Sequence, residues 1–151
     1  MRRILGFVLI LAVFVAGAAA WAVWNVRATL PRSDETARVD AAGTLAAGTT
    51  VVLEYDGLGV PTIRAQDELS LAFGQGWAHA RDRRFQMELY RRSALGQLSE
   101  WVGSGTLSSD RQFRTFGFAG VADSALVLLS PERRKLFDAY AAGVNAWDKG
   151  H

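Results

Sequence analysis

The chain opens with an uncharged, strongly apolar stretch. Arg2 and Arg3 precede the 21 residues 4–24. A helix of that length spans about 30 Å, which is the thickness of the hydrocarbon core of a bilayer. This pattern predicts that residues 1–26 form a signal anchor or a signal peptide. A signal peptide would be cleaved near the small residues 18–20, whereas an anchor would keep Trp21 and Trp24 at the far membrane interface.

The length of this stretch and its two tryptophans favour the uncleaved anchor. Both forms export the rest of the chain, because the arginines stay inside. We therefore expect the domain in the periplasm. It would be anchored in the inner membrane through residues 4–24, or secreted to the periplasm if the signal is cleaved.

Residues 27–48 show little periodicity and many small or polar side chains, so we interpret them as a tether. Residues 49–55, TTVVLEY, are β-branched and aromatic, which indicates a strand. A turn cluster follows at 56–59 and an extended segment at 60–64, which predicts a β-hairpin over 50–64. A lone hairpin is marginal in water, so we expect its strands to join a sheet that this chain does not contain.

Helical periodicity dominates the rest of the chain. Asp67 is a good N-cap for a helix from Glu68 to about residue 98, with a bend near Gly74 and Gly76 and an end near Gly96. Residues 101–105 indicate a flexible loop. The sequence therefore predicts an α+β fold: one N-terminal transmembrane or signal helix, one hairpin and mostly α-helices.

Two more helices are expected towards the C-terminus, over 119–129 and from residue 131 onward. Ser130 and Pro131, followed by an acidic residue, are typical of a helix N-terminus. The second of these helices carries an apolar stripe, formed by Leu136, Tyr140, Val144 and Trp147.

Composition excludes several function classes. The chain has no cysteine and only two histidines. Disulfide frameworks, thiolate metal sites, cysteine nucleophiles and multi-histidine metal sites are therefore excluded. The net charge of +2 comes from Arg2 and Arg3, and the remaining chain has 15 basic and 15 acidic residues. No excess positive charge is left for a nucleic-acid surface, so we predict no nucleic-acid partner.

The segment 79–92 is the densest in candidate chemistry. His79 and Asp82 are three residues apart, as a general base and the group that orients it could be. Five arginines, two acids and interleaved apolar residues are, however, more typical of an amphipathic packing helix. In that case Asp82 and Glu88 pair with neighbouring arginines. We assign no catalytic, cofactor-binding or metal-binding residue to this chain.

Several short motifs follow one another in a distinctive order between residues 50 and 148. The residues concerned are Val51, Glu54, Asp56, Gly59, Val60, Pro61, Ile63, Ala65, Phe73, Gly74, Gly76, His79, Ala80, Asp82, Arg83, Phe85, Gln86, Met87, Glu88, Arg91, Arg92, Gly96, Glu100, Gly103, Asp110, Arg114, Ala139, Tyr140, Gly143, Val144, Asn145, Ala146 and Trp147. This order resembles the start of the α-chain region of the penicillin acylase (penicillin amidase) family. Residues 49–151 would then be an incomplete penicillin acylase α-region.

The resemblance implies an N-terminal-nucleophile hydrolase with a four-layer αββα sandwich fold. Such enzymes are exported precursors that cut themselves into chains and hydrolyse linear amides of the penicillin or N-acyl-homoserine-lactone type. The serine at the start of the β chain is the nucleophile, and its own amino group is the base. The partners implied are the rest of the precursor, including the β region, and a small-molecule amide substrate.

The resemblance places the nucleophile, the oxyanion donors and the ligands of a structural Ca²⁺ beyond His151. We therefore expect the chain alone to be inactive and to hold no cofactor. The matched residues are interpreted as scaffold, with Asp82 and Arg83 as a structural ion pair. An alternative is a membrane-anchored, non-enzymatic interaction module or an inactive truncated relative.

Overall fold

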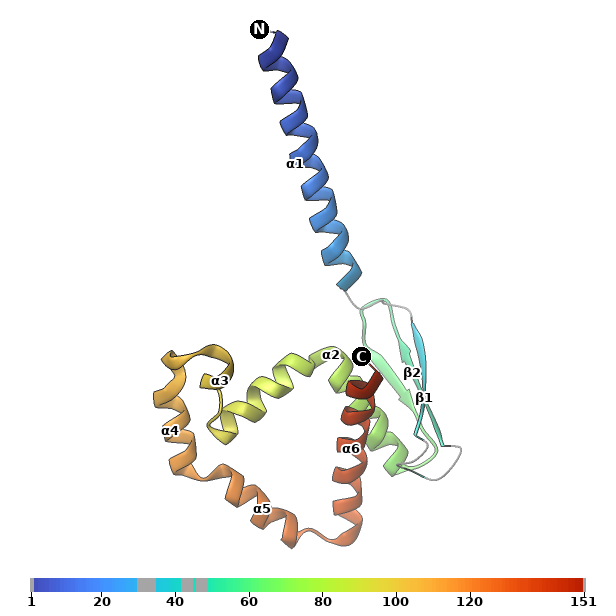
Figure 1. The fold of residues 1–151 in the computed structure, drawn as a ribbon. Coiled ribbons are helices and arrows are strands. Elements are labelled where there is room, and N and C mark those ends of the chain that lie inside the picture. The colour runs from blue at the N-terminus through green and yellow to red at the C-terminus, as the bar shows by residue number, and fades with distance from the viewer. Residues whose placement is uncertain (1, 30–34, 42–44, 46–48, 151) are drawn as a thin grey trace. The chain divides into compact units, whose positions relative to one another are not determined.

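The computed structural model describes residues 2–29, 35–41, 45 and 49–150, and these fall into two compact units (Figure 1). The first unit, Met1–Arg32, contains helix α1 (Arg2–Thr29). The second, Ser33–His151, contains all the strands and the other helices.

Helix α1 confirms that residues 4–24 are helical. Within the part of the chain that the structure describes, however, no helix combines the length and the hydropathy needed to cross a membrane. The predicted membrane-spanning anchor is therefore not supported by this structure.

The sheet has three antiparallel strands in the order β1-β2-β3. Their bounds are Thr36–Asp40 for β1, Thr50–Tyr55 for β2 and Pro61–Arg64 for β3. The hairpin of β2 and β3 confirms the prediction for 50–64. In its turn, the Asp56 carboxylate accepts hydrogen bonds from the backbone N–H groups of Leu58 and Val60.

Strand β1 corrects the prediction of a tether over 27–48. It pairs with β2 along its whole length, from Thr36 opposite Glu54 to Asp40 opposite Thr50. Ala37 and Val39 are its half-buried positions and pack on the core. Part of the sheet that the hairpin was expected to lack is thus supplied by the chain itself.

Helix α2 (Glu68–Leu95) begins where predicted. The Asp67 carboxylate accepts from the Ser70 backbone N–H at 2.7 Å and from its hydroxyl at 2.6 Å. The helix ends at Gly96, which adopts a left-handed conformation with φ 65°. The bend lies at Arg83, with φ −137° and ψ 21°, and not at Gly74 and Gly76 as predicted.

The next segment is more helical than expected. It contains α3 (Ser99–Val102), the 3₁₀ turn η1 (Ser104–Thr106), α4 (Leu107–Phe116) and α5 (Phe118–Leu128). The loop predicted over 101–105 is therefore mostly helical turn, and α4 was not predicted. Helix α6 (Pro131–Gly150) starts at the predicted Pro131.

The core lies between the sheet and the first half of α2. Val51 and Leu53 of β2 are fully buried, together with Phe73 of α2. Helix α6 crosses α2 on its other side, and the Trp77 and Trp147 rings meet edge to face with centroids 5.0 Å apart. The molecule is therefore an α+β protein with a small sheet, while the four-layer sandwich remains a prediction.

The crossing of α2 and α6 depends on two glycines. A Cβ atom placed on Gly143 would collide with the Phe73 carbonyl oxygen, and one placed on Gly76 would collide with the Tyr140 carbonyl oxygen. Both residues are buried, and the two backbones touch directly at this point. Such small residues allow the close approach that holds the two helices side by side.

Candidate functional site

His79 lies on the exposed side of the crossing between α2 and α6. Its Nδ1 atom is 2.9 Å from the Tyr140 hydroxyl, and the two rings meet at a steep angle with centroids 5.8 Å apart. Burial raises the pKa of the Tyr140 hydroxyl. Among the described residues His79 makes no hydrogen bond with Asp82, so the base and orienting pair considered from the sequence does not form.

Asp82 belongs instead to a cluster around Arg81. The Arg81 side chain is only 8% exposed, and its guanidinium lies 4.0 Å above the Tyr55 ring. It donates to the Glu35 carboxylate at 2.9 Å and is 4.0 Å from that of Asp82. The predicted pair of Asp82 with Arg83 is thus wrong, because the adjacent Arg81 turns inward between sheet and helix.

The electrostatics of this cluster follow from its burial. Desolvation raises the pKa of the Asp82 carboxyl, and the nearby Arg81 charge opposes that rise. Desolvation also raises the pKa of the Tyr55 hydroxyl. Glu35 directly precedes β1 and Tyr55 ends β2, and neither was predicted to pair with Arg81. Their pairing with Arg81 connects segments up to 46 residues apart, so no local spacing indicates it.

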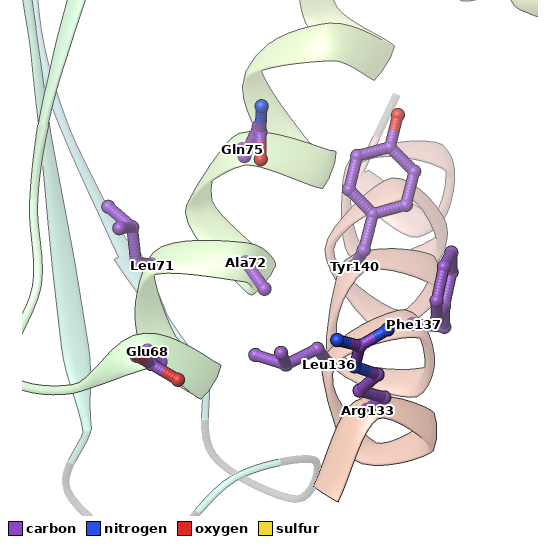
Figure 2. Close-up of a pocket in the computed structure, with 8 residues that line it drawn as sticks. All are labelled: Glu68, Leu71, Ala72, Gln75, Arg133, Leu136, Phe137 and Tyr140. Carbon is purple, nitrogen blue, oxygen red and sulfur yellow. The ribbon is translucent and has the colours of Figure 1, made fainter. Parts of the chain in front are cut away.

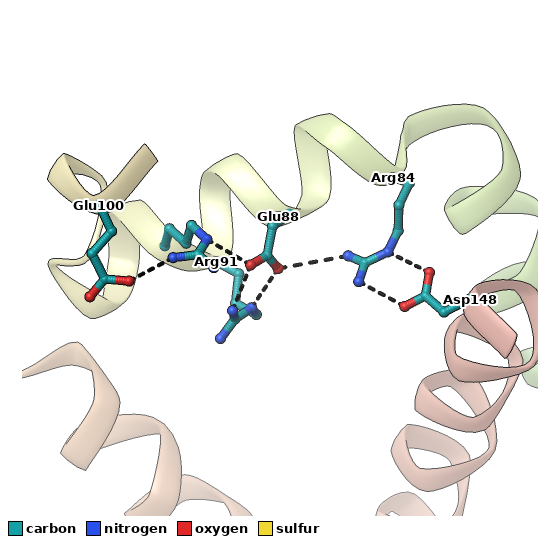
Figure 3. Close-up of polar contacts among 6 residues, drawn as sticks. Arg84, Glu88, Arg91, Glu100 and Asp148 are labelled. Carbon is teal, nitrogen blue, oxygen red and sulfur yellow. Dashed lines mark hydrogen bonds and ion pairs between the residues drawn. The ribbon is translucent and has the colours of Figure 1, made fainter. Parts of the chain in front are cut away.

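A second charged cluster surrounds Glu88 in the second half of α2 (Figure 3). The Glu88 carboxylate accepts two hydrogen bonds from Arg91, both at 2.7 Å, and one from Arg92 at 2.8 Å. These bonds, with those from Arg91 having the largest effect, hold the pKa of Glu88 at about 2. The predicted pairing of Glu88 with its neighbouring arginines is confirmed.

The Glu88 cluster extends to two other helices. Arg92 also donates to Glu100 of α3 at 2.8 Å. Arg84 lies 3.7 Å from Glu88 and makes two hydrogen bonds to Asp148 of α6, at 2.6 and 2.7 Å (Figure 3). The hydrogen bonds to Asp148 raise the pKa of Arg84. Every cation in the cluster thus faces a carboxylate, which favours a structural role over anion binding.

Two aromatic rings stand beside this cluster. Phe85 and Trp101 stack with centroids 5.6 Å apart, and the Arg92 guanidinium lies 4.8 Å from the Trp101 ring. With Arg84 and Glu88 they line an open cavity of about 500 Å³. The rings remain substantially exposed, in contrast to Trp77, which is in the core.

Asp110 of α4 holds the turn between α2 and α3. It is buried, and its two carboxylate oxygens accept from the backbone N–H groups of Leu98 and Ser99 at 2.9 and 2.8 Å. The Ser99 side chain has the largest effect in lowering the pKa of the Asp110 carboxyl, and the two backbone hydrogen bonds lower it further. Arg114, one turn further along, donates to the Gly96 carbonyl at 2.8 Å. Both residues belong to the motif order noted in the sequence, and their role here is to fix a turn.

An apolar groove lies between the first halves of α2 and α6 (Figure 2). It has a volume of about 700 Å³. Its lining residues are Glu68, Leu71, Ala72 and Gln75 of α2 with Arg133, Leu136, Phe137 and Tyr140 of α6. We call this the α2–α6 groove. It combines an apolar floor with few polar groups, as binding surfaces often do.

The last kind of site to consider among the described residues is a metal site. They contain no group of three or more His, Asp or Glu side chains arranged to hold a metal ion. We therefore assign none of them to the Ca²⁺ site that the resemblance implies. The arrangement is that of a scaffold in which buried and networked charges hold helices to each other and to the sheet.

Comparison with known proteins identifies the class. A sequence profile described as penicillin amidase matches residues 50–151. The chain is 40% identical over 97 residues to a penicillin acylase 2 proenzyme from Pseudomonas sp. strain SE83, covering 64% of this chain and 12% of that protein. It is 34% identical over 124 residues to an acyl-homoserine lactone acylase from Pseudomonas fluorescens Pf0-1. That match covers 82% of this chain and 15% of that protein.

A solved structure shows the same fold. The chain is similar to a thermostable penicillin G acylase from Alcaligenes faecalis with a TM-score of 0.61 and 32% identity, covering 68% of this chain and 54% of that one. The protein belongs to the penicillin amidase family, as the sequence predicted. It spans only about an eighth of the length of the curated relatives named above.

Proposed function

We propose that this chain is the N-terminal region of an exported amidohydrolase that cleaves linear amide bonds. The match of the penicillin amidase profile to residues 50–151 supports this most strongly. The relatives named as penicillin acylases and acyl-homoserine lactone acylases support two substrate types. These are penicillin-type amides and N-acyl-homoserine lactones.

In this proposal the chain supplies scaffold and not reacting groups. The nucleophilic serine, its α-amino base and the oxyanion donors lie in polypeptide that follows residue 151. The low coverage of the relatives supports such a continuation. The sheet and the α2–α6 pair would position that polypeptide, and a structural Ca²⁺, if bound, would take its ligands from it.

The test compares this chain with the longer protein that its gene encodes. Both are assayed with a chromogenic phenylacetyl amide and with an N-acyl-homoserine lactone. We expect turnover of at least one substrate by the longer protein and none by residues 33–151. Hydrolysis by residues 33–151 that is lost in His79→Ala would overturn the proposal and place the reaction at His79 and Tyr140.

We also propose that the domain resides in the periplasm. The basic start and the uncharged residues 4–24 support export. An alkaline phosphatase fused after residue 151 should then be active. A fusion that is inactive while the protein is stably produced would contradict export. The size of the mature product shows whether cleavage occurs near residues 18–20.

A further inference from the structure

Helix α5 turns its apolar face to solvent. Counted from Phe118, the residues Val121, Ala122, Ala125 and Leu128 lie three, four, seven and ten positions along, which places all five on one face of the helix. An amphipathic helix normally buries such a face. No residue of α5 is buried, however, and Val121 and Leu128 are 62% and 86% exposed. Exposed apolar side chains that gather on one face mark a surface that something else covers.

Three phenylalanines extend this face into the end of α4. The ring centroids of Phe113, Phe116 and Phe118 lie 5.6 to 6.3 Å from one another. Phe116 and Phe118 remain exposed in this cluster. We call the exposed side chains Phe116, Phe118, Val121 and Leu128 the α5 surface. Phenylalanine and leucine gathered on one side of a helix are typical of segments that lie in the interface of a membrane.

The hydroxyl groups near the α5 surface are already bonded within their own helices. The Ser124 hydroxyl donates to the Gly120 carbonyl, and the Thr115 hydroxyl donates to the Arg111 carbonyl, both at 2.8 Å. A hydroxyl bonded in this way loses little when it leaves water. Asp123, the only charged residue of α5, lies on the face opposite the apolar one. The α5 surface can therefore enter an apolar medium without burying a charge or an unpaired hydroxyl.

Positive charge gathers next to the α5 surface. Helix α5 leads into α6 through two residues, so the start of α6 lies close to the end of α5 (Figure 1). That start carries Arg133, Arg134 and Lys135, which are exposed and form no ion pair with another described residue. Residues 107–137 have five basic and three acidic side chains, and one of the acids, Asp110, is buried. The chain from residue 4 onward has no excess of either sign, so positive charge is concentrated here.

We propose that the α5 surface docks on an anionic phospholipid surface. Helix α5 lies along the membrane plane, with its apolar side chains among the upper acyl chains and the basic residues at the start of α6 against lipid phosphates. This occupant fits both observations, because it offers an apolar layer beside negative charge. A second copy of the chain would bring the same positive charges together, which disfavours self-association through this surface. The inference goes beyond the proposed hydrolase function and does not depend on it.

The test reports where α5 lies when the protein is on vesicles. The chain has no cysteine, so Leu128→Cys carries a single fluorophore, and Val121→Cys provides a second reporter. The vesicles contain phosphatidylglycerol and phosphatidylcholine with brominated acyl chains, which quench a fluorophore only within the apolar layer. We expect a fluorescence loss of about twofold or more at both positions.

Leu58→Cys is the matched control for this measurement. Leu58 is as exposed as Leu128 but lies in the turn between β2 and β3, so its label should stay unquenched. Because quenching is local, vesicle binding through another part of the chain does not produce it at position 128. Equal quenching at 58 and 128 would contradict docking through the α5 surface.

Charge neutralisation tests the contact with lipid phosphates. Arg134→Gln with Lys135→Gln should raise the lipid concentration for half-maximal quenching at position 128 about tenfold. Vesicles of phosphatidylcholine alone should have a similar effect. Arg38→Gln with Arg83→Gln is the matched control, because it removes two exposed charges from β1 and α2. Equal effects of the two pairs would contradict the predicted contact at the start of α6.

Three further results overturn the inference. The first is a label at 128 that stays unquenched on anionic vesicles. The second is a label at 128 that is shielded from an aqueous quencher without lipid in the longer protein that the gene encodes, because protein then covers the α5 surface. The third is shielding without lipid that grows with protein concentration, which identifies a second copy. Quenching at 121 and 128 in the longer protein supports the inference whether or not that protein hydrolyses an amide.

Discussion

Glu88 makes the stability of this protein sensitive to acid. Its folded pKa of about 2 lies below the ordinary value of 4.5, because Arg91 and Arg92 bind the carboxylate. A lowered folded pKa contributes stability that is fully present above about pH 4.5 and is lost as the pH falls through about 2. The folded protein should therefore lose stability progressively over this window.

Glu88→Gln should remove this contribution. We expect a loss of about 1 kcal/mol in the free energy of unfolding at pH 7. The loss is small because the arginines are partly exposed and solvent screens their charges. The difference between variant and wild type should shrink as the pH approaches 2. Urea unfolding followed by circular dichroism at pH 7, 4 and 2.5 measures it. Glu68→Gln, which removes a carboxylate without an ion pair, should change little, and an equal loss there would contradict the prediction.

Residues that act locally could be predicted from the sequence. Asp67 caps α2 because its carboxylate reaches a backbone group three positions away, and Ser130 and Pro131 mark the start of α6 in the same way. Asp148 could not be predicted. Its partner Arg84 is 64 residues distant, and only the crossing of α2 and α6 brings them together. The inward turn of Arg81 was missed for the same reason.

At the scale of the secondary-structure elements, the crossing of α2 and α6 has no room for a larger side chain at its glycines. Gly143→Ala places a methyl group against the Phe73 carbonyl, which is backbone and cannot move aside. We expect a loss of about 1–3 kcal/mol in the free energy of unfolding. Urea unfolding measures this, and amide exchange in the middle of α6 should rise.

Gly120→Ala is the matched control for this substitution. Gly120 lies within α5, and an added Cβ would meet nothing within 4 Å. Alanine there should stabilise the helix by about 0.5–1 kcal/mol. A similar effect of the two substitutions would show that helix propensity, and not the crossing, decides the result at Gly143.

Two elements and one bend could not be predicted from the sequence pattern. Strand β1 was missed because it is five residues long and its inward positions are only Ala37 and Val39. Helix α4 was missed because no side chain caps its N-terminus and its sequence is mostly polar. The bend in α2 occurs at Arg83, where no glycine or proline indicates it. Strand β1 is set by its pairing with β2, and α4 by the hydrogen bonds that Asp110 accepts from the turn before α3, so tertiary contacts decide both.

At the scale of the whole molecule, helix α5 leaves much apolar surface uncovered. Val127 is 79% exposed and Leu128 is 86% exposed at its C-terminal end, and Phe116 and Phe118 are 55% and 45% exposed around its start. We expect the isolated chain to bind a hydrophobic fluorescent dye while folded. Val127→Lys with Leu128→Lys should reduce this fluorescence and leave the unfolding midpoint within error, since neither side chain is packed.

Leu58→Lys is the control for dye binding. Leu58 is 89% exposed but stands alone in the turn between β2 and β3. A single exposed apolar residue should contribute little to a dye site. A loss of fluorescence in Leu58→Lys that equals the loss in the α5 double variant would contradict the assignment of the surface to α5.

The long sequence separation between α2 and α6 has a consequence for synthesis on the ribosome. The contacts from Gly76 to Tyr140 and from Arg84 to Asp148 both bridge more than 60 residues. At about 5–20 residues per second, several seconds pass between the emergence of these two helices. Strands β1 to β3 can pair during that interval, whereas the outer face of α2 stays uncovered. Nascent chains paused before codon 131 should therefore recruit holding chaperones more strongly than chains released after codon 150.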